Sequence, residues 1–130
     1  MFDMTVPNAG PQRILVVEDD ALIGSLLTEV LQALGYAVCP VETTEDGAVS
    51  AAARHRPDLM IVDLQLAAGS GLSAMARISQ TGPIPHVFMS GDSHQPATLG
   101  MVLLRKPFRQ SDLIRAIDQA LCGETPGRAA

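Results

Sequence analysis

Residues 13–20 read RILVVEDD, a run of four apolar residues that follows one arginine and ends in three acidic residues. Similar runs occur at 59–63, LMIVD, and at 101–106, MVLLRK, where the last residue is Lys106, the only lysine of the chain. A short apolar run without in–out alternation is typical of a strand buried on both faces of a parallel sheet. The carboxyl ends of parallel strands meet at one edge, so we expect the acidic groups and the lysine to gather there.

The composition predicts one globular domain. The chain has 130 residues, 47% hydrophobic and 18% charged, with a net charge of −5. This is enough for one folded core, and the negative charge disfavours nucleic acid or an anionic membrane as a direct partner. We expect a cytoplasmic protein because no membrane-length apolar stretch or signal-peptide pattern is present. Cys39 and Cys122 lack ligand spacing and are expected to be reduced thiols.

Strand-like and helix-like segments alternate over residues 13–121, between expected tails at 1–12 (flexible) and 122–130. The predicted strands cover 13–19, 37–41, 58–63, 84–90 and 101–106. The predicted helices run from an N-cap at Asp20 to a stop at Gly35, from Thr43 or Thr44 to about Arg54, from the end of a loop at 69–71 to about Ser79, and over 110–121. This alternation predicts an α/β fold with a five-stranded parallel sheet and right-handed crossovers. Pro40 cannot donate to a strand ladder, which places 37–41 at a sheet edge.

Helical spacing assigns an inward face to three of these helices. The inward residues are Leu22, Ile23, Leu26, Leu27, Val30, Leu31 and Leu34 in the first, Leu72, Met75 and Ile78 in the third, and Leu113, Ile114, Ile117 and Leu121 in the last. The connection over 91–100 leaves room for little more than one turn, whereas a parallel crossover usually takes about a dozen residues or more. We therefore expect a shortened fourth helix.

Ligand sites of open α/β sheets lie beyond the carboxyl ends of the strands, and that edge would collect Glu18, Asp19, Asp63, Ser90 and Lys106. A single terminal acid is usually a helix cap or a solvated strand end, but here four strands deliver polar groups together. Clustered carboxylates repel one another unless a cation lies among them, and oxygen ligands suit Mg²⁺. A carboxylate can also form an aspartyl phosphate, which a lysine and a serine hydroxyl would bind.

Four segments resemble motifs of one known family, the receiver domains of two-component response regulators. They are RILVVEDD at 13–20, PDLMIVDL at 57–64, VFMSG at 87–91 and LRKPF at 104–108. The resemblance covers residues 13–121. It implies a flavodoxin-like, doubly wound sheet of strand order 2-1-3-4-5, in which the second strand is an edge.

The resemblance implies a role for each matching residue. Asp63 is the phosphoacceptor. Mg²⁺ (or Mn²⁺) is held by Glu18, Asp19, Asp63 and the backbone carbonyl of Gln65, with Asp19 a direct ligand and Glu18 acting through water. Ser90 is the switch residue and Lys106 binds the phosphoryl group. The bond before Pro107 is cis, and Gly71 is the glycine of the loop after the acceptor strand.

Some positions depart from the family pattern. Leu103 stands where the family usually has Tyr or Phe, and an aliphatic side chain has no polar tip to alternate between buried and exposed states. Ser90-Gly91 replaces the commoner Thr-Ala pair, which together with the short connection resembles a class of stand-alone receivers with a short fourth helix. Gln65 and Asp92 match the two positions that tune phosphoryl lifetime.

The leading hypothesis is a stand-alone receiver that takes a phosphoryl group from a sensor histidine kinase or a histidine phosphotransfer protein. It would signal by contact with an unknown downstream protein, pass the group along a phosphorelay or act as a phosphate sink. A phosphorylation-independent adaptor is the alternative, favoured by Leu103 and disfavoured by the full set of acids and lysine. An Asp-nucleophile phosphatase would need a second acid at position 65, where Gln65 stands. We expect a monomer, because the face many receivers use to dimerise includes the fourth helix.

Overall fold

In the computed structural model, which describes residues 10–91 and 101–122, five parallel strands form one sheet. The strands are β2 (Arg13–Val17), β3 (Ala37–Val38), β4 (Leu59–Asp63), β5 (His86–Ser90) and β6 (Leu103–Arg105). Their order across the sheet is β3-β2-β4-β5-β6, and every neighbouring pair is parallel. In chain order this is 2-1-3-4-5, so the predicted flavodoxin-like α/β fold is confirmed and β3 is an edge strand.

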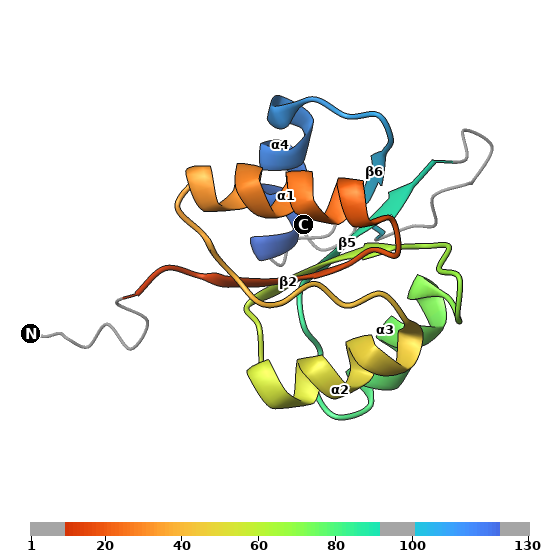
Figure 1. The fold of residues 1–130 in the computed structure, drawn as a ribbon. Coiled ribbons are helices and arrows are strands. Elements are labelled where there is room, and N and C mark those ends of the chain that lie inside the picture. The colour runs from red at the N-terminus through yellow and green to blue at the C-terminus, as the bar shows by residue number, and fades with distance from the viewer. Residues whose placement is uncertain (1–9, 92–100, 123–130) are drawn as a thin grey trace, which may run out of the picture.

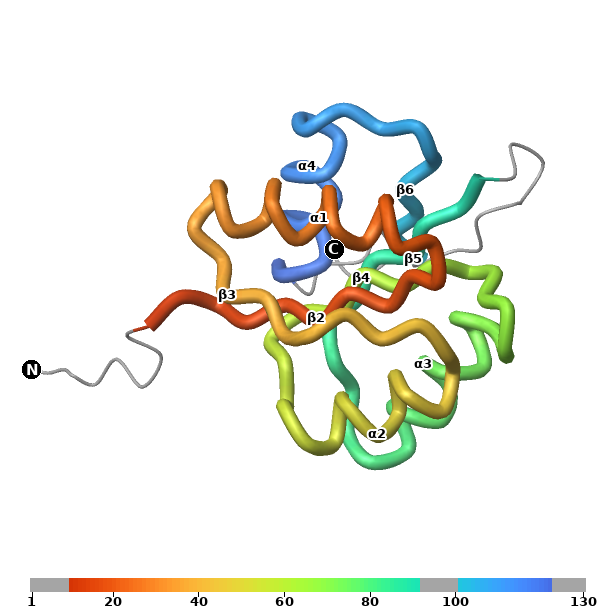
Figure 2. Tube along the Cα trace, viewed as in Figure 1, coloured from red at the N-terminus to blue at the C-terminus, as the bar shows by residue number. Residues whose placement is uncertain are grey.

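Helices cover both faces of the sheet (Figures 1 and 2). Helices α1 (Ala21–Ala33) and α4 (Gln110–Leu121) lie on one face, and α2 (Glu45–His55) and α3 (Gly71–Ser79) lie on the other. The starts follow from local chemistry. The side chains of Asp20, Thr44 and Ser70 accept hydrogen bonds from backbone N–H groups in the first turns of α1, α2 and α3, which satisfies donors that a helix start leaves free.

The covered sheet explains why the strands are continuously apolar. Ile14 and Val16 belong to the hydrophobic core beneath α1 and α4. Leu15 and Val17, which alternate with them, belong to the core beneath α2 and α3. All four side chains are fully buried. Because successive side chains of a strand point to opposite faces, a strand with two covered faces needs an apolar residue at every position.

The second strand, Ala37–Val38, is shorter than the predicted 37–41. The N–H groups of Ala37 and Cys39 donate to Gln12 and Ile14, but the next bond to β2 comes from Glu42 to Val16. Regular spacing would have placed that donor one residue earlier. The chain therefore takes up one extra residue before pairing resumes, as at a β-bulge. Pro40 lies in this stretch, at a position that faces the open edge of the sheet and needs no donor.

Four apolar residues that were expected to face inward are exposed, and this part of the prediction was wrong. Leu22 is 68% exposed, Leu26 52%, Leu72 47% and Ile114 39%. In α1 the apolar positions span about half of the circumference, since successive residues turn by roughly 100°. The sheet covers only the arc around Leu27 and Leu31, and the residues at the edge of the stripe remain in solvent.

The remaining differences concern ends and gaps. The predicted strands 13–19, 58–63, 84–90 and 101–106 extend one to three residues beyond the observed strands. Several of these end residues still form backbone hydrogen bonds between neighbouring strands, among them Glu18, Asp58 and Lys106. The shortened fourth helix, predicted within 91–100, falls almost entirely outside the described residues, as do most of the two predicted tails. Within the described ranges, no helix combines the length and the apolar character that crossing a membrane requires.

Candidate functional site

The sheet brings the carboxyl ends of β2, β4, β5 and β6 to one edge, with the predicted polar residues at or just beyond them. Asp63 ends β4 and Ser90 ends β5. Glu18 follows β2 directly, and Lys106 follows β6. Three of these residues are buried despite their polarity: Glu18 is 1% exposed, Asp63 6% and Ser90 4%. Burial of polar groups at the end of an apolar strand requires partners for them.

Lys106 is the partner of two of these acids. Its Nζ donates to Glu18 Oε1 at 2.7 Å and to Asp63 Oδ2 at 2.8 Å. The backbone N–H of Lys106 donates to the carbonyl of Ser90 at 2.8 Å, which fixes the start of its side chain beside β5. Burial opposes the charge of this ammonium, but the hydrogen bonds to Asp63 and Glu18 together outweigh it and raise the pKa of Lys106. The lysine is therefore charged at neutral pH.

Glu18 is almost fully buried and lies beside a second carboxyl group, that of Asp63. Burial, helped by neighbouring Asp63, raises the pKa of the Glu18 carboxyl to about 7 against the opposing hydrogen bonds from Lys106 and the Asp20 N–H. A carboxylate pair with a single ammonium between them carries a surplus negative charge. A cation added beside the pair would lower the pKa of Glu18 and stabilise its ionised form.

Asp19 completes a cluster of acidic groups that could hold such a cation. Glu18, Asp19 and Asp63 each offer a carboxylate oxygen, and these three oxygens lie within 4.8 Å of one another. Asp19 is exposed, so water has access to the cluster. An open set of carboxylate oxygens is the donor set that Mg²⁺ or Mn²⁺ prefers. The residues present thus fit a hard divalent cation.

The loop after β4, residues 64–70, is attached to this cluster through its backbone. The N–H of Gln65 donates to Asp63 Oδ1 at 3.0 Å, and the N–H of Ala67 donates to Asp19 Oδ2 at 2.7 Å. Gly71 follows the loop, and a Cβ added there would lie 2.2 Å from the carbonyl oxygen of Asp63. Only glycine allows α3 to begin this close to the end of β4.

The sequence also singled out Leu103, Pro107 and Asp92. Leu103 is half-buried and packs against the core beneath α2 and α3. It lies opposite Phe88 in the β5–β6 pairing. The Lys106–Pro107 bond is cis, the isomer that the resemblance implied. Asp92 lies outside the described residues.

Sequence reasoning missed Glu45, the first residue of α2. It accepts hydrogen bonds from the Ser70 N–H at 3.0 Å and from the Ser73 hydroxyl at 2.7 Å, and it pairs with Arg77 at 2.9 Å. An acid in the first turn of a helix is ordinary, because it complements the helix dipole. The sequence therefore carried no signal that this acid also contacts the loop after β4.

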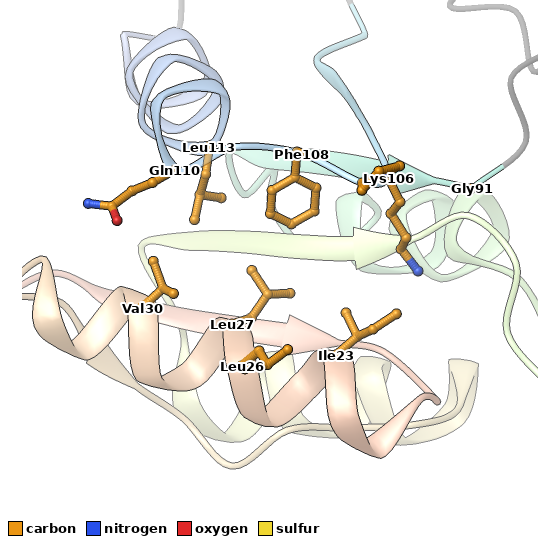
Figure 3. A pocket seen from close by; sticks show the side chains of 10 residues that line it. Ile23, Leu26, Leu27, Val30, Gly91, Lys106, Phe108, Gln110 and Leu113 are labelled. Atoms are coloured by element: carbon orange, nitrogen blue, oxygen red, sulfur yellow. The ribbon is translucent and has the colours of Figure 1, made fainter.

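Sequence reasoning also missed a groove between α1 and α4, which Figure 3 shows from close by. Its volume is about 540 Å³. Apolar side chains dominate its lining, and Lys106 and Gly91 stand at the end next to the acidic cluster. The apolar lining residues are Ile23, Leu26, Leu27, Val30, Pro107, Phe108 and Leu113. The groove is thus continuous with the edge of the sheet where the polar residues gather.

Comparisons with known proteins agree with this geometry. Residues 14–118 match the family described as response regulator receiver domain. The chain is 34% identical over 119 residues to the transcriptional regulatory protein PdtaR of Mycobacterium tuberculosis, covering 87% of this chain and 58% of that protein. It is 35% identical over 119 residues to the phyllosphere-induced regulator PhyR of Methylorubrum extorquens, covering 84% and 43%. The chain therefore spans about half the length of these two relatives.

Solved structures show the same likeness. The solution structure of the receiver domain of PhyR from Erythrobacter litoralis is 29% identical and superposes with a TM-score of 0.76, covering 87% of this chain and 92% of that one. The crystal structure of PhyR from Brucella abortus is 27% identical with a TM-score of 0.77, covering 87% and 49%.

Proposed function

This chain belongs to the family of response regulator receiver domains, and on that premise we propose that it accepts a phosphoryl group on Asp63 from a sensor histidine kinase or a histidine phosphotransfer protein. The observation that carries the proposal is the position of Lys106, whose Nζ donates to both buried acids, Glu18 and Asp63. A charged lysine held 2.8 Å from an Asp63 oxygen is suited to neutralise a phosphoryl group bound there.

The reaction is a displacement at phosphorus. A carboxylate oxygen of Asp63 attacks the phosphohistidine phosphorus, forming the P–O bond of an acyl phosphate. The P–N bond breaks, and its electron pair leaves with the imidazole nitrogen, which takes up a proton. The Gln65 N–H and Lys106 Nζ contact different oxygens of Asp63 and orient the carboxylate for this attack. The reaction needs no nucleophile other than Asp63, so we assign the chain as a phosphoacceptor and not as an enzyme with turnover on other substrates.

We assign the cation as Mg²⁺, with Mn²⁺ as a substitute, because three carboxylate oxygens lie within 4.8 Å of one another. Asp19 and Asp63 would bind it directly, Glu18 through water, and the Gln65 backbone carbonyl would add a ligand. When bound, it neutralises charge on the phosphoryl oxygens. The assignment of Ser90 as the switch residue and of Gln65 and Asp92 as lifetime-tuning residues remains part of this proposal.

We further propose that the chain works in the cytoplasm as a monomeric receiver. Its output would be contact with a downstream protein, transfer along a phosphorelay or removal of phosphoryl groups as a sink. Leu103 favours a second candidate, a receiver-like adaptor that binds its partner without phosphorylation. This half-buried leucine packs on the core. Because it is aliphatic, it has no polar tip that could change position in response to Ser90.

Beryllofluoride, a mimic of the phosphoryl group, separates the two candidates. We expect it to shift backbone amide resonances of residues 18–19, 63–65, 90–91 and 104–106 in the presence of Mg²⁺, and not in Asp63→Asn. A partner that binds only the beryllofluoride-loaded protein would support the receiver. Equal binding to the wild type and to Asp63→Asn, with no shifts in either, would support the adaptor.

A further inference from the structure

The loop over residues 64–70, between β4 and α3, is held by acidic residues on two sides. On one side, Asp19 accepts the hydrogen bond from the Ala67 N–H at 2.7 Å. On the other side, Glu45 makes two bonds to the loop. Its Oε1 accepts from the Ser70 N–H at 3.0 Å, and its N–H donates to the Ala68 carbonyl at 3.0 Å. The loop thus connects a member of the acidic cluster to the first residue of α2.

Glu45 is itself fixed by side chains of α3. Its Oε2 accepts from the Ser73 hydroxyl at 2.7 Å and from Arg77 at 2.9 Å, and its side chain is only 16% exposed. The Ser73 hydroxyl, the Ser70 N–H and Arg77 all bind the ionised carboxylate, which holds the pKa of Glu45 below its usual range. The Glu45 carboxylate is therefore ionised near neutral pH, and its hydrogen bonds fix its orientation.

The loop backbone also packs directly on Glu45. Gly69 has a φ of +94°, and a Cβ added there would lie 2.4 Å from the Cβ of Glu45. The bend at Gly69 lets the loop bond to Glu45 at two points. The Ser70 N–H donates to the Glu45 side chain, and the Ala68 carbonyl accepts from the Glu45 backbone N–H. A loop with backbone bonds at positions 65, 67, 68 and 70 has little freedom left to move.

We propose that Glu45 is a positioning residue for the acidic cluster, acting through this loop. The proposal rests on the function proposed above, in which Asp19 and the Gln65 carbonyl hold Mg²⁺. By anchoring the far end of the loop, Glu45 keeps the Ala67 N–H in place, and that N–H orients the carboxylate of Asp19. Without the Glu45 side chain, the loop must become ordered when the metal binds. The entropy cost of that ordering lowers the affinity for Mg²⁺.

The competing explanation is that Glu45 only clamps α2 to α3 through Arg77. Arg77 provides a matched control, because it pairs with Glu45 and with Asp46 at 2.8 Å, and within the described part of the chain it forms no hydrogen bond to the loop backbone. Glu45→Ala removes the side-chain bond to the loop. Arg77→Gln weakens the clamp and leaves that bond in place. Glu45→Gln keeps an amide oxygen that can still accept from the Ser70 N–H.

The experiment is an Mg²⁺ titration of the full chain by calorimetry, alongside urea unfolding and hydrogen exchange of the Ala67 amide without metal. We expect Glu45→Ala to weaken Mg²⁺ binding about tenfold and to speed exchange at Ala67. Glu45→Gln should retain most of the affinity, and Arg77→Gln should lose stability while Kd stays within about twofold of the wild type. This pattern separates positioning from a loss of stability alone.

Three outcomes would overturn the proposal. The first is an unchanged Kd and unchanged Ala67 exchange in Glu45→Ala. The second is an equal loss of affinity in Glu45→Ala and Arg77→Gln, which would mean that the clamp alone matters. Both leave Mg²⁺ binding by the wild type intact, and with it the function proposed above. The third, no Mg²⁺ binding by the wild type, would overturn both proposals.

Discussion

Lys106→Met removes the cation between two buried acids and keeps an apolar side chain of similar length. In the native protein Lys106 Nζ lies 2.7 Å from Glu18 Oε1 and 2.8 Å from Asp63 Oδ2. The Glu18 side chain is 1% exposed and that of Asp63 9%, so water replaces the lost ammonium only in part. Removing one partner of a buried ion pair costs about 3–5 kcal/mol, because the other charge is left uncompensated.

The cost depends on pH in a direction that follows from Glu18. Its pKa is already raised from 4.5 to about 7, mainly by burial, which corresponds to about 3 kcal/mol between its two protonation states. A group whose pKa is raised on folding binds more protons in the folded state, so stability falls as pH rises through that range. At pH 5 a protonated Glu18 no longer needs the ammonium, and the loss should shrink to about 1 kcal/mol. At pH 8 it should reach about 3–4 kcal/mol.

Urea unfolding at pH 5 and pH 8, with and without Mg²⁺, measures both values. Arg115→Met is the control, because the Arg115 side chain is 74% exposed and lies as far as 3.6 Å from its partner Asp112. Such an exposed ion pair contributes less than about 1 kcal/mol to stability. We also expect Mg²⁺ to stabilise Lys106→Met more than the wild type, since the cation fills the same electrostatic need. A loss that is equal at both pH values, or below about 1 kcal/mol at pH 8, would refute the reasoning.

Three further predictions concern the same edge of the sheet and its supports. With the pKa of Glu18 about 7 in the absence of metal, Mg²⁺ affinity should fall about tenfold from pH 8 to pH 6, and binding should release protons; calorimetry in two buffers tests this, and a flat Kd would contradict it. Gly71→Ala places a Cβ 2.2 Å from a backbone oxygen, whereas one at Gly91 meets nothing within 4 Å, so thermal unfolding should show a loss of about 2–4 kcal/mol for the first and under about 0.5 kcal/mol for Gly91→Ala. Leu22→Ala should lower stability by less than about 0.5 kcal/mol and Leu27→Ala by about 2–5 kcal/mol, because Leu22 is 68% exposed and Leu27 3%. Equal losses in chemical denaturation would contradict this and would mean that Leu22 is buried, as the helical spacing predicted.

The strands, the edge position of the second strand and the polar edge could be predicted from strong local patterns, whereas the full strand order followed from the resemblance to receiver domains. A short continuous apolar run such as Ile14–Val17 is typical of a strand covered on both faces. Pro40 then marks the edge strand, since it lacks the N–H that a central strand must donate. The juxtaposition of Glu18, Asp63 and Lys106 follows from the parallel arrangement, which brings all carboxyl ends to one side.

The width of the buried helix faces and the support of the loop could not be predicted in the same way. Spacing shows which residues share a face of α1, but the sheet beneath decides how much of that face it covers, and Leu22 and Leu26 fall outside. Glu45 and Ser70 are 25 residues apart. Their contact depends on the packing of α2 against α3, which leaves no periodic signal in the chain.

The most direct test of the account is whether Asp63 accepts a phosphoryl group. The protein is incubated with Mg²⁺ and a small phosphodonor, and the product is reduced with borohydride, digested and sequenced by mass spectrometry. We expect one modified residue, Asp63, with the modification formed only with Mg²⁺ and absent in Asp63→Asn. Modification at another residue, or none in a folded wild type that binds Mg²⁺, would contradict it.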